Sequence, residues 1–358
     1  MADRTGGLEG VVVAETVLSH VDGERGRLII RGLPLEALAA GGFERAVALL
    51  WDGFVVTGPG PLEISEHLGT ARERAFDRIG RWLHAAEGRS VPEGMRLALA
   101  TLPDGASAPD AAATLPVALA AMLRARQGLV PMAPDRRQRT AADFLRMMRG
   151  VPASEAEVAA LDTYLATVID HGLNASTFTA RVVASTRASL AAAAGAGFAA
   201  LTGSLHGGAP GPVLDMLDAI GTPERIDPWL EAALARGERL MGFGHRVYRV
   251  RDPRADALKA ALQRLSPATR RLAFAELVER RALALLRLRK QGRAIDTNVE
   301  FFTALLLDAL GVPREAMVSV FAMSRVAGWI AHALEQQRTG RIIRPASRYI
   351  GPEPAAAA

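Results

Sequence analysis

The sequence predicts a mainly all-α protein, and three observations support this fold class. Hydrophobic residues make up 49% of the 358 residues, which is enough for a sizeable core. Only 5% are aromatic and alanine is abundant, and alanine is the best helix former. Apolar residues recur at helical spacing, as at Val158, Leu161, Leu165 and Val168. The length suits two domains or one large domain.

Residues 8–33 are the exception to this helical pattern. Two short β-branched runs, GVVVAET (10–16) and GRLIIRG (26–32), flank the segment HVDGERG (20–26). Such runs on either side of a turn-forming segment are typical of two paired strands. The sequence therefore predicts a short β-hairpin near the N-terminus.

From residue 34 onward, helices dominate the prediction. Helical spacing is found in 35–53 and 155–170, and a long charged helix is predicted over 270–292. An apolar helix whose interior carries one arginine, Arg325, is predicted over 314–337. The segment GAGFAA (195–200) matches a dinucleotide-binding pattern, but it follows an alanine-rich helical run and not a strand. We therefore interpret its glycines as sites of close helix packing.

Two breaks in the helical pattern predict the domain organisation. Residues 203–212 (GSLHGGAPGP) hold four glycines and two prolines, and a second break lies at 308–314. A chain that leaves at the first break and returns at the second predicts a large domain of residues 1–211 and 309–358. Residues 212–308 would form a smaller inserted domain.

Composition excludes several classes of function. The net charge is +5 and all but two of the 43 basic residues are arginine, but they are interspersed with acids and form no long basic run. The chain has no cysteine, which excludes disulfides and thiolate chemistry. The N-terminus lacks an apolar leader pattern, and the longest uncharged stretch, 188–214, is broken by prolines. We expect a soluble cytoplasmic protein that binds neither nucleic acid nor membrane.

Three of the seven histidines, His171, His206 and His245, lie in glycine- or asparagine-containing breaks after helical segments, where side chains can face a cleft. His245 belongs to the segment MGFGHRVYRVRDPR (241–254). That segment opens on glycines, closes on a proline turn, and contains four arginines: Arg246, Arg249, Arg251 and Arg254. It predicts a loop that holds an anion next to an imidazole.

Two charged residues sit in otherwise apolar helical segments. Arg325 is expected to meet a carboxylate from the protein or from a ligand, because arginine is rarely buried unpaired. Glu300 is either a first-turn acid favoured by the helix dipole or a base at the rim of a cleft. His332, seven residues after Arg325, is interpreted as a structural histidine.

These residues together fit a di- or tricarboxylate clamped by arginines, with histidine and carboxylate moving protons next to a carbonyl. The histidines lack close spacing, so no metal site is predicted.

Several long segments resemble the signature blocks of the citrate synthase family. They are SLHGGAPGPVLDML, MGFGHRVYRVRDPRADALK, TNVEFFTALLLDALGVP, SRVAGWIAHALEQQRTGRIIRPASRYIG, HGLNASTFTARVVAST and the opening GLEGVVVAETVLSHVDGERGRLIIRG. The resemblance covers most of the chain, with the segments in the same order. In its length and simple N-terminus, the chain is similar to the shorter bacterial and archaeal type of the family. The resemblance implies a multi-helical homodimer whose large and small domains close over oxaloacetate and an acyl-CoA, with no permanently bound cofactor.

The resemblance also implies roles for matching residues. His206 would hold the thioester oxygen, His245 would protonate the oxaloacetate carbonyl, and Glu300 would stand at the position of the catalytic base. Oxaloacetate would be bound by His171, Asn174, Arg254, Arg325 and, from the other subunit, Arg344. The coenzyme would lie against Gly242 and Gly244, with Arg249 near its phosphates.

Glu300 departs from the family pattern, which usually has aspartate there. Glutamate has a similar reference pKa, but its carboxylate lies one methylene further from the backbone, and a misplacement of roughly 1 Å can cost on the order of 100-fold in rate. Two alternatives therefore stay open: a 2-methylcitrate synthase that uses propionyl-CoA, and a low-activity or non-catalytic paralogue that binds CoA or carboxylates.

Overall fold

The computed structural model describes residues 7–8, 10–55, 60–207, 210–245, 247–265, 269–289 and 295–352, and it is mainly helical as predicted. Short 3-10 helices lie at Ile79–Arg81, His84–Ala86, Pro223–Arg225 and Arg314–Ala316. The α-helices of the described residues are α1 Leu35–Gly41, α2 Phe43–Trp51, α3 Pro61–Asp77, α4 Val91–Ala100, α5 Ala108–Arg126, α6 Thr140–Arg149, α7 Glu155–Val168, α8 Ala175–Ser185, α9 Leu190–Leu201, α10 Pro210–Ile220, α11 Ile226–Ala235, α12 Pro253–Gln263, α13 Thr269–Arg289, α14 Val299–Ala309 and α15 Met317–Thr339.

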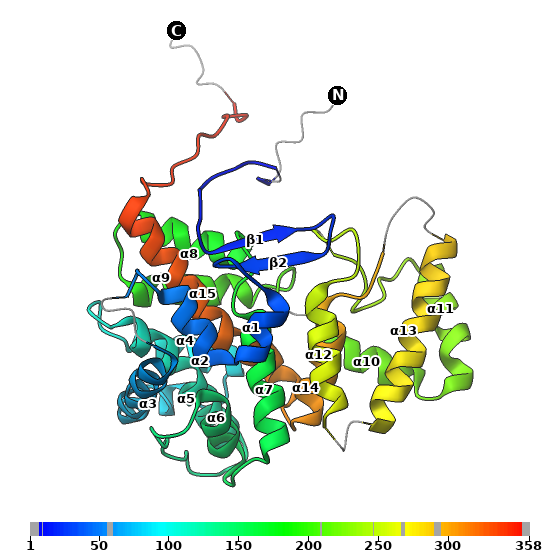
Figure 1. Ribbon diagram of the computed structural model, residues 1–358, viewed down its shortest axis with the longest axis horizontal. Helices are drawn as coiled ribbons and strands as arrows, with labels where there is room; N and C mark the ends of the chain where they lie inside the picture. The colour runs from blue at the N-terminus through cyan, green and yellow to red at the C-terminus, as the bar shows by residue number, and fades with distance from the viewer. Residues whose placement is uncertain are drawn as a thin grey trace.

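The helices form two groups along the long axis of the molecule (Figure 1). Helices α3 to α6 lie at one end, α11 and α13 lie at the other, and α7, α12 and α14 lie between them. Helices α11 to α13, and all but the ends of α10 and α14, fall within the segment 212–308 for which a separate domain is predicted. The division into a large and a small domain stays a prediction.

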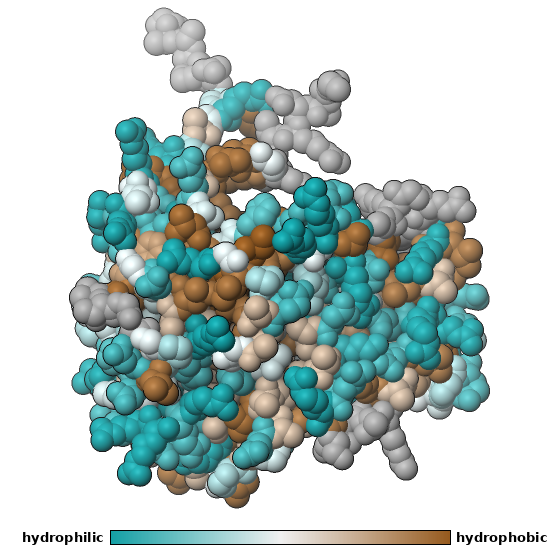
Figure 2. Space-filling model, in the orientation of Figure 1, coloured by the Kyte–Doolittle hydropathy of each residue, from teal (hydrophilic) through white to brown (hydrophobic). Residues whose placement is uncertain are grey.

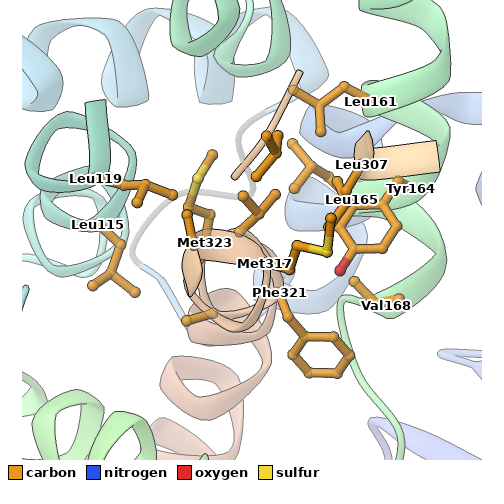
Figure 3. Packing of buried hydrophobic residues seen from close by; sticks show 14 of the residues in the cluster. Leu115, Leu119, Leu161, Tyr164, Leu165, Val168, Leu307, Met317, Phe321 and Met323 are labelled. Carbon is orange, nitrogen blue, oxygen red and sulfur yellow. The ribbon is translucent and has the colours of Figure 1, made fainter. Parts of the chain in front are cut away.

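Helix α15 forms the centre of the larger group. The helical stretch Arg314–Thr339 is long and apolar enough to cross a membrane by length and composition, yet 89% of its apolar window is buried inside the protein. Figure 3 shows Met317, Phe321 and Met323 of α15 among leucines of α5 and α7. Each fully buried side chain of this size contributes about 1.5–3 kcal/mol. The stretch is therefore a core helix.

The β-hairpin exists, but its predicted first strand is wrong. Strand β1 (Ser19–Asp22) pairs antiparallel with β2 (Arg27–Ile30), which also pairs with β3 (Leu33–Pro34). Residues 10–16 form no strand. The Asp22 carboxylate accepts the N–H of Arg25 at 3.1 Å, and Gly26 takes a φ of +61°, so the turn is confined to 23–26.

Glycines account for two other local features. The helical segment predicted over 35–53 breaks at Gly42, whose φ is +81° and where a Cβ would lie 2.5 Å from the Asp162 carboxylate. In α9, a Cβ at Gly197 would lie 2.7 Å from the Trp329 ring. The segment GAGFAA is therefore helical and Gly197 serves close helix packing, as interpreted from the sequence, whereas a Cβ at Gly195 would meet nothing within 4 Å.

The two terminal segments carry exposed apolar side chains. Both segments project from the body of the molecule on the side of the hairpin (Figure 1). Figure 2 shows hydrophobic surface on these segments and on the part of the body beneath them. The exposed side chains are Leu8, Val11, Val12, Val17, Ile342, Tyr349 and Ile350.

Candidate active site

Two glycines shape the loop that carries His245. Gly242 and Gly244 have φ values of +85° and +83°, in a backbone region that residues other than glycine rarely adopt. A Cβ at Gly242 would also lie 2.8 Å from the Phe301 ring. The loop can therefore pack closely on α14 because Gly242 lacks a side chain, and Gly244 supplies a second backbone conformation that favours glycine.

Asn298 ties this loop to the start of α14. Its Nδ2 donates to the carbonyl of Gly244 at 2.8 Å, and its backbone N–H donates to the carbonyl of Gly242 at 2.9 Å. Its Oδ1 accepts the N–H of Glu300 at 3.0 Å and so caps the helix. One asparagine thereby fixes the loop of His245 relative to the first turn that carries Glu300.

The hydrogen bonds of His245 determine its tautomer. Its Nδ1 accepts the backbone N–H groups of Val247 and Tyr248, both at 3.0 Å. Because an N–H can only donate, the neutral ring carries its proton on Nε2. Burial, and then the charge of Arg254, lower the pKa of His245 to about 4. Nη2 of Arg254 lies 3.4 Å from Nε2, so two donors face the space that a ligand oxygen would occupy.

Arg254 is held by a carboxylate that the sequence analysis did not single out. Its Nε and Nη2 donate to the two oxygens of Asp252 at 3.0 and 2.8 Å, and both residues are buried. The Asp252 carboxylate also accepts the N–H groups of Arg254 and Val299. Asp252 thus fixes the guanidinium and joins α12 to α14. The only sequence signal for it is its position before Pro253, which suits a helix N-cap.

His171 lies against the same loop. Its Nε2 is 3.1 Å from the hydroxyl of Tyr248, and its ring centroid is 5.5 Å from that of His245. Burial, followed by the charges of Arg254 and Arg325, holds the pKa of His171 well below its usual value. Tyr248 was also missed by sequence analysis, although it lies inside the segment 241–254.

Arg325 is a buried cation with an unsatisfied donor. Its Nε donates to the carbonyl of Val168 at 2.8 Å and its guanidinium lies 4.5 Å from the Phe321 ring centroid. Its Nη2 makes no hydrogen bond, and within the described residues no carboxylate forms an ion pair with it. Burial lowers the pKa of Arg325 to about 10; the charge of Asp170 opposes this shift and that of Arg254 adds to it. Such a group indicates an anionic ligand, because an unpaired buried charge is strongly unfavourable.

Glu300 lies in the first turn of α14 with Oε2 buried and without a hydrogen-bond partner. Burial raises the pKa of Glu300 to about 7; Arg254 opposes this shift and Asp252 adds to it. A carboxyl group that titrates near neutrality suits a general base.

His206 is positioned by Ser176, which lies in the first turn of α8. Its Nε2 accepts the backbone N–H of Ser176 at 3.2 Å and lies 2.9 Å from the Ser176 hydroxyl. The neutral ring therefore carries its proton on Nδ1. The side-chain oxygen of Asn174 caps α8 by accepting the N–H of Thr177. The Nδ2 of Asn174 donates to the carbonyl of Gly172 at 3.2 Å. The segment 171–176 thus supports both His171 and His206.

Two predicted site residues are not brought to this cluster. Arg249 is exposed; its guanidinium lies 4.0 Å from Glu24, and its backbone N–H donates to Gly23 in the hairpin turn. Arg344 lies in the exposed extended segment after α15 and takes part in none of the contacts above. Arg246 and the glycine after Gly207 lie outside the described residues.

His332 is structural, as interpreted from the sequence. It is fully buried, with Nδ1 accepting from Arg181 at 2.9 Å and Nε2 lying 3.3 Å from Asp170. The Asp170 carboxylate also accepts the N–H of Gly172, so this network supports the turn that begins at His171.

Comparison with known proteins identifies the family. The family model for the citrate synthase C-terminal domain matches residues 7–346. The chain belongs to the citrate synthase family. It is therefore an acyltransferase of this family, and the fold is that of its solved members.

Individual relatives differ in their named substrates. The citrate synthase of Haloferax volcanii is 37% identical over 368 residues, covering 96% of this chain and 95% of that protein. The 2-methylcitrate synthase of Mycobacterium tuberculosis is 35% identical over 367 residues, covering 97% and 90%. The family thus leaves the acyl substrate open.

Two solved structures share the whole fold. The citrate synthase of Thermotoga maritima has a TM-score of 0.87 at 32% identity, covering 98% of this chain and 97% of that one. The Thermoplasma acidophilum enzyme, solved with carboxymethyl coenzyme A and oxaloacetate, has a TM-score of 0.85 at 25% identity, covering 98% and 96%.

Proposed function

We propose that this chain is a citrate synthase that condenses acetyl-CoA with oxaloacetate and hydrolyses citryl-CoA to citrate and CoA. The observation that carries the proposal is the buried guanidinium of Arg325, which forms no ion pair with a carboxylate of the described residues. Its charge lowers the pKa of both His171 and Glu300. A dianionic substrate with a carbonyl between its carboxylates matches this combination of cations, neutral imidazoles and a base.

Oxaloacetate would be bound by Arg254, Arg325, His171 and Asn174, with Arg344 of the partner subunit completing the clamp. Arginine is suited to this because its planar fork matches a carboxylate. The Asp252 carboxylate keeps the Arg254 fork in place before substrate arrives. The Nε2–H of His245 would then face the substrate carbonyl.

The reaction would use three side chains. Glu300 takes a proton from the methyl group of acetyl-CoA, while His206 donates a hydrogen bond to the thioester oxygen on which charge develops. The new carbon–carbon bond forms at the oxaloacetate carbonyl, whose oxygen receives the Nε2 proton of His245. Water then cleaves the thioester, giving citrate and CoA. The coenzyme would approach along Gly242 and Gly244, with Arg249 near its phosphates.

The assembly is proposed from the terminal segments. Val12 and Ile350 are 86% and 88% exposed in the single chain, and apolar side chains on two projecting segments are favourable contacts for a second copy. We propose a cytoplasmic homodimer in which residues 1–211 with 309–358 form a large domain and residues 212–308 form a small one that closes on it.

The experiment is thiol release with and without oxaloacetate, from acetyl-CoA and separately from propionyl-CoA. The chain has no cysteine, so it adds no thiol background. Oxaloacetate-dependent release from acetyl-CoA is expected. Glu300→Gln should abolish it while oxaloacetate binding persists.

The alternative is a 2-methylcitrate synthase, which the Mycobacterium tuberculosis relative favours. One methylene in a binding pocket discriminates between two substrates by only about 1–3 kcal/mol. The ratio of kcat/KM for acetyl-CoA and propionyl-CoA therefore decides between the two activities. No release from either thioester by a folded chain that binds oxaloacetate would leave the non-catalytic paralogue.

A further inference from the structure

Three buried polar atoms without hydrogen-bond partners belong to neighbouring side chains of α7 and α14. They are Oε2 of Glu300, the hydroxyl oxygen of Tyr164 and Oγ1 of Thr303. Tyr164 and Thr303 are fully buried. A buried polar group that makes no hydrogen bond is unfavourable by about 1–3 kcal/mol, so three together need an explanation.

Their positions on the helices bring them to one place. Glu300, Thr303 and Leu307 follow at three- and four-residue spacing, so they share one face of α14. Figure 3 shows Tyr164 of α7 beside Leu307. The Thr303 hydroxyl lies next to the Tyr164 phenol, although no well-formed hydrogen bond joins them.

The electrostatics agree with this placement. Burial raises the pKa of Tyr164 well above its usual value, and among the charged groups Glu300 has the largest effect. The phenol therefore keeps its proton and can only serve as a hydrogen-bond donor to the Glu300 carboxylate. A carboxyl group on a side chain one methylene longer than aspartate needs such a support, because it has an additional rotatable bond.

We propose that Tyr164 and Thr303 form a polar seat behind Glu300, in which the Tyr164 hydroxyl, directly or through one buried water, orients the Glu300 carboxylate for proton abstraction. Tyr164 is then a positioning residue, and Thr303 orients the phenol. The inference rests on the proposed role of Glu300 as the base.

The test is Tyr164→Phe, which removes one hydroxyl and keeps the ring that packs in the core. With acetyl-CoA and oxaloacetate, kcat should fall about ten-fold, while KM for oxaloacetate stays within about two-fold. The rising limb of the pH profile should move to higher pH, because a donor that favours the ionised carboxylate is lost. Thr303→Val should show the same changes to a smaller extent.

Two further variants separate positioning from general damage. Thr167→Val removes a buried hydroxyl from the same helix, one that donates to the Thr163 carbonyl at 2.7 Å, and should leave kcat and the pH profile unchanged. In a Glu300→Asp background the shorter carboxylate no longer reaches the seat, so adding Tyr164→Phe should change kcat by less than about two-fold. An unchanged pH profile in Tyr164→Phe, or an equal loss in both backgrounds, would overturn the proposal.

A crystal structure of the unliganded chain gives a readout that does not need turnover. We expect the Tyr164 hydroxyl, or an ordered water bound to it, within hydrogen-bond distance of Glu300. A wild-type chain without thiol release would refute the proposed function, whereas a Glu300 carboxylate turned away from Tyr164 in that crystal would refute the seat alone.

Discussion

At the scale of single residues, the proposed role of Glu300 as the base predicts how activity depends on pH. Its pKa of about 7 means that the carboxyl group is largely protonated at pH 6 and ionised at pH 8. The base must be ionised to accept a proton, and His245, with a pKa of about 4, stays neutral over this range. We therefore expect kcat/KM to rise from pH 6 to pH 8 with an apparent pKa near 7 in steady-state assays. A profile that is flat over this range would contradict the assignment.

The same shift affects stability with a defined sign. The folded-state pKa of Glu300 lies above the unfolded value, so its favourable contribution is complete below that value and is lost as the pH rises through about 7. Glu300→Gln mimics the protonated form. Its melting temperature relative to wild type should therefore increase between pH 5 and pH 8 in ligand-free calorimetry. A constant difference across this range would show that Glu300 does not titrate there.

Tyr248 gives a second residue-level prediction. Its hydroxyl is the group that contacts Nε2 of His171, and its backbone N–H binds His245. Tyr248→Phe removes only the first contact. We expect KM for oxaloacetate to rise several-fold, in keeping with about 1 kcal/mol for one hydrogen bond, with a smaller change in kcat. Calorimetric titration with oxaloacetate checks the binding term directly.

The sequence predicts part of this site for a clear reason. Arg325 stands out because it is charged in an apolar helix, and His245 stands out because glycines precede it. Asp252 and Ser176 could not be predicted in the same way, because their roles depend on hydrogen bonds to residues that the fold brings near. A tyrosine in a loop gives no sequence signal of a role in binding. Only the contact of its hydroxyl with Nε2 of His171 links Tyr248 to the site.

At the scale of elements, Gly242 tests how the loop is fixed to α14. Gly242→Ala meets both a positive φ and the Phe301 ring, whereas Gly237→Ala meets a φ of +77° with nothing within 4 Å. Gly237→Ala should lose about 1 kcal/mol of unfolding free energy with normal activity. Gly242→Ala should lose more and reduce kcat by on the order of 100-fold, because His245 is displaced. Denaturant titration and steady-state kinetics check both, and equal effects would contradict the packing argument.

Helices were predicted better than the strands at this scale. A periodicity sustained over 15 or more residues, as in 155–170 and 314–337, gives many consistent positions. The first strand of the hairpin was predicted at 10–16 instead of 19–22, and Val11 and Val12 in the predicted segment are exposed and do not pack on the core. The break at Gly42 depends on the Asp162 carboxylate from α7, which the local sequence does not contain.

At the scale of the whole molecule, Arg344 tests the proposed dimer. Arg344→Ala and Glu300→Gln should each inactivate the enzyme alone. If Arg344 serves the site of the partner subunit, a mixed dimer of the two variants has one intact site. Random co-assembly should then restore about a quarter of wild-type activity, and the purified mixed dimer should have about half.

The control for this experiment is Glu300→Gln mixed with His206→Ala, because both residues are proposed for the site of their own subunit and the mixed dimer then has no intact site. The two variants are co-expressed with different tags and the mixed dimer is purified. Absence of recovered activity in the Arg344 pair would place Arg344 in its own subunit's site or outside any site.

The central position of α15 has a consequence for how the chain is made. Leucines of α5 and α7 pack on this helix, and Glu335 accepts the N–H of Val17 at 2.9 Å, a contact between residues 318 positions apart. A ribosome releases residues 317–339 only after all the helices that pack on them. The apolar faces of the earlier helices therefore stay uncovered until α15 emerges, and in that interval they are substrates for chaperones. The core closes only after α15 has emerged, and contacts of such long range predict slow folding.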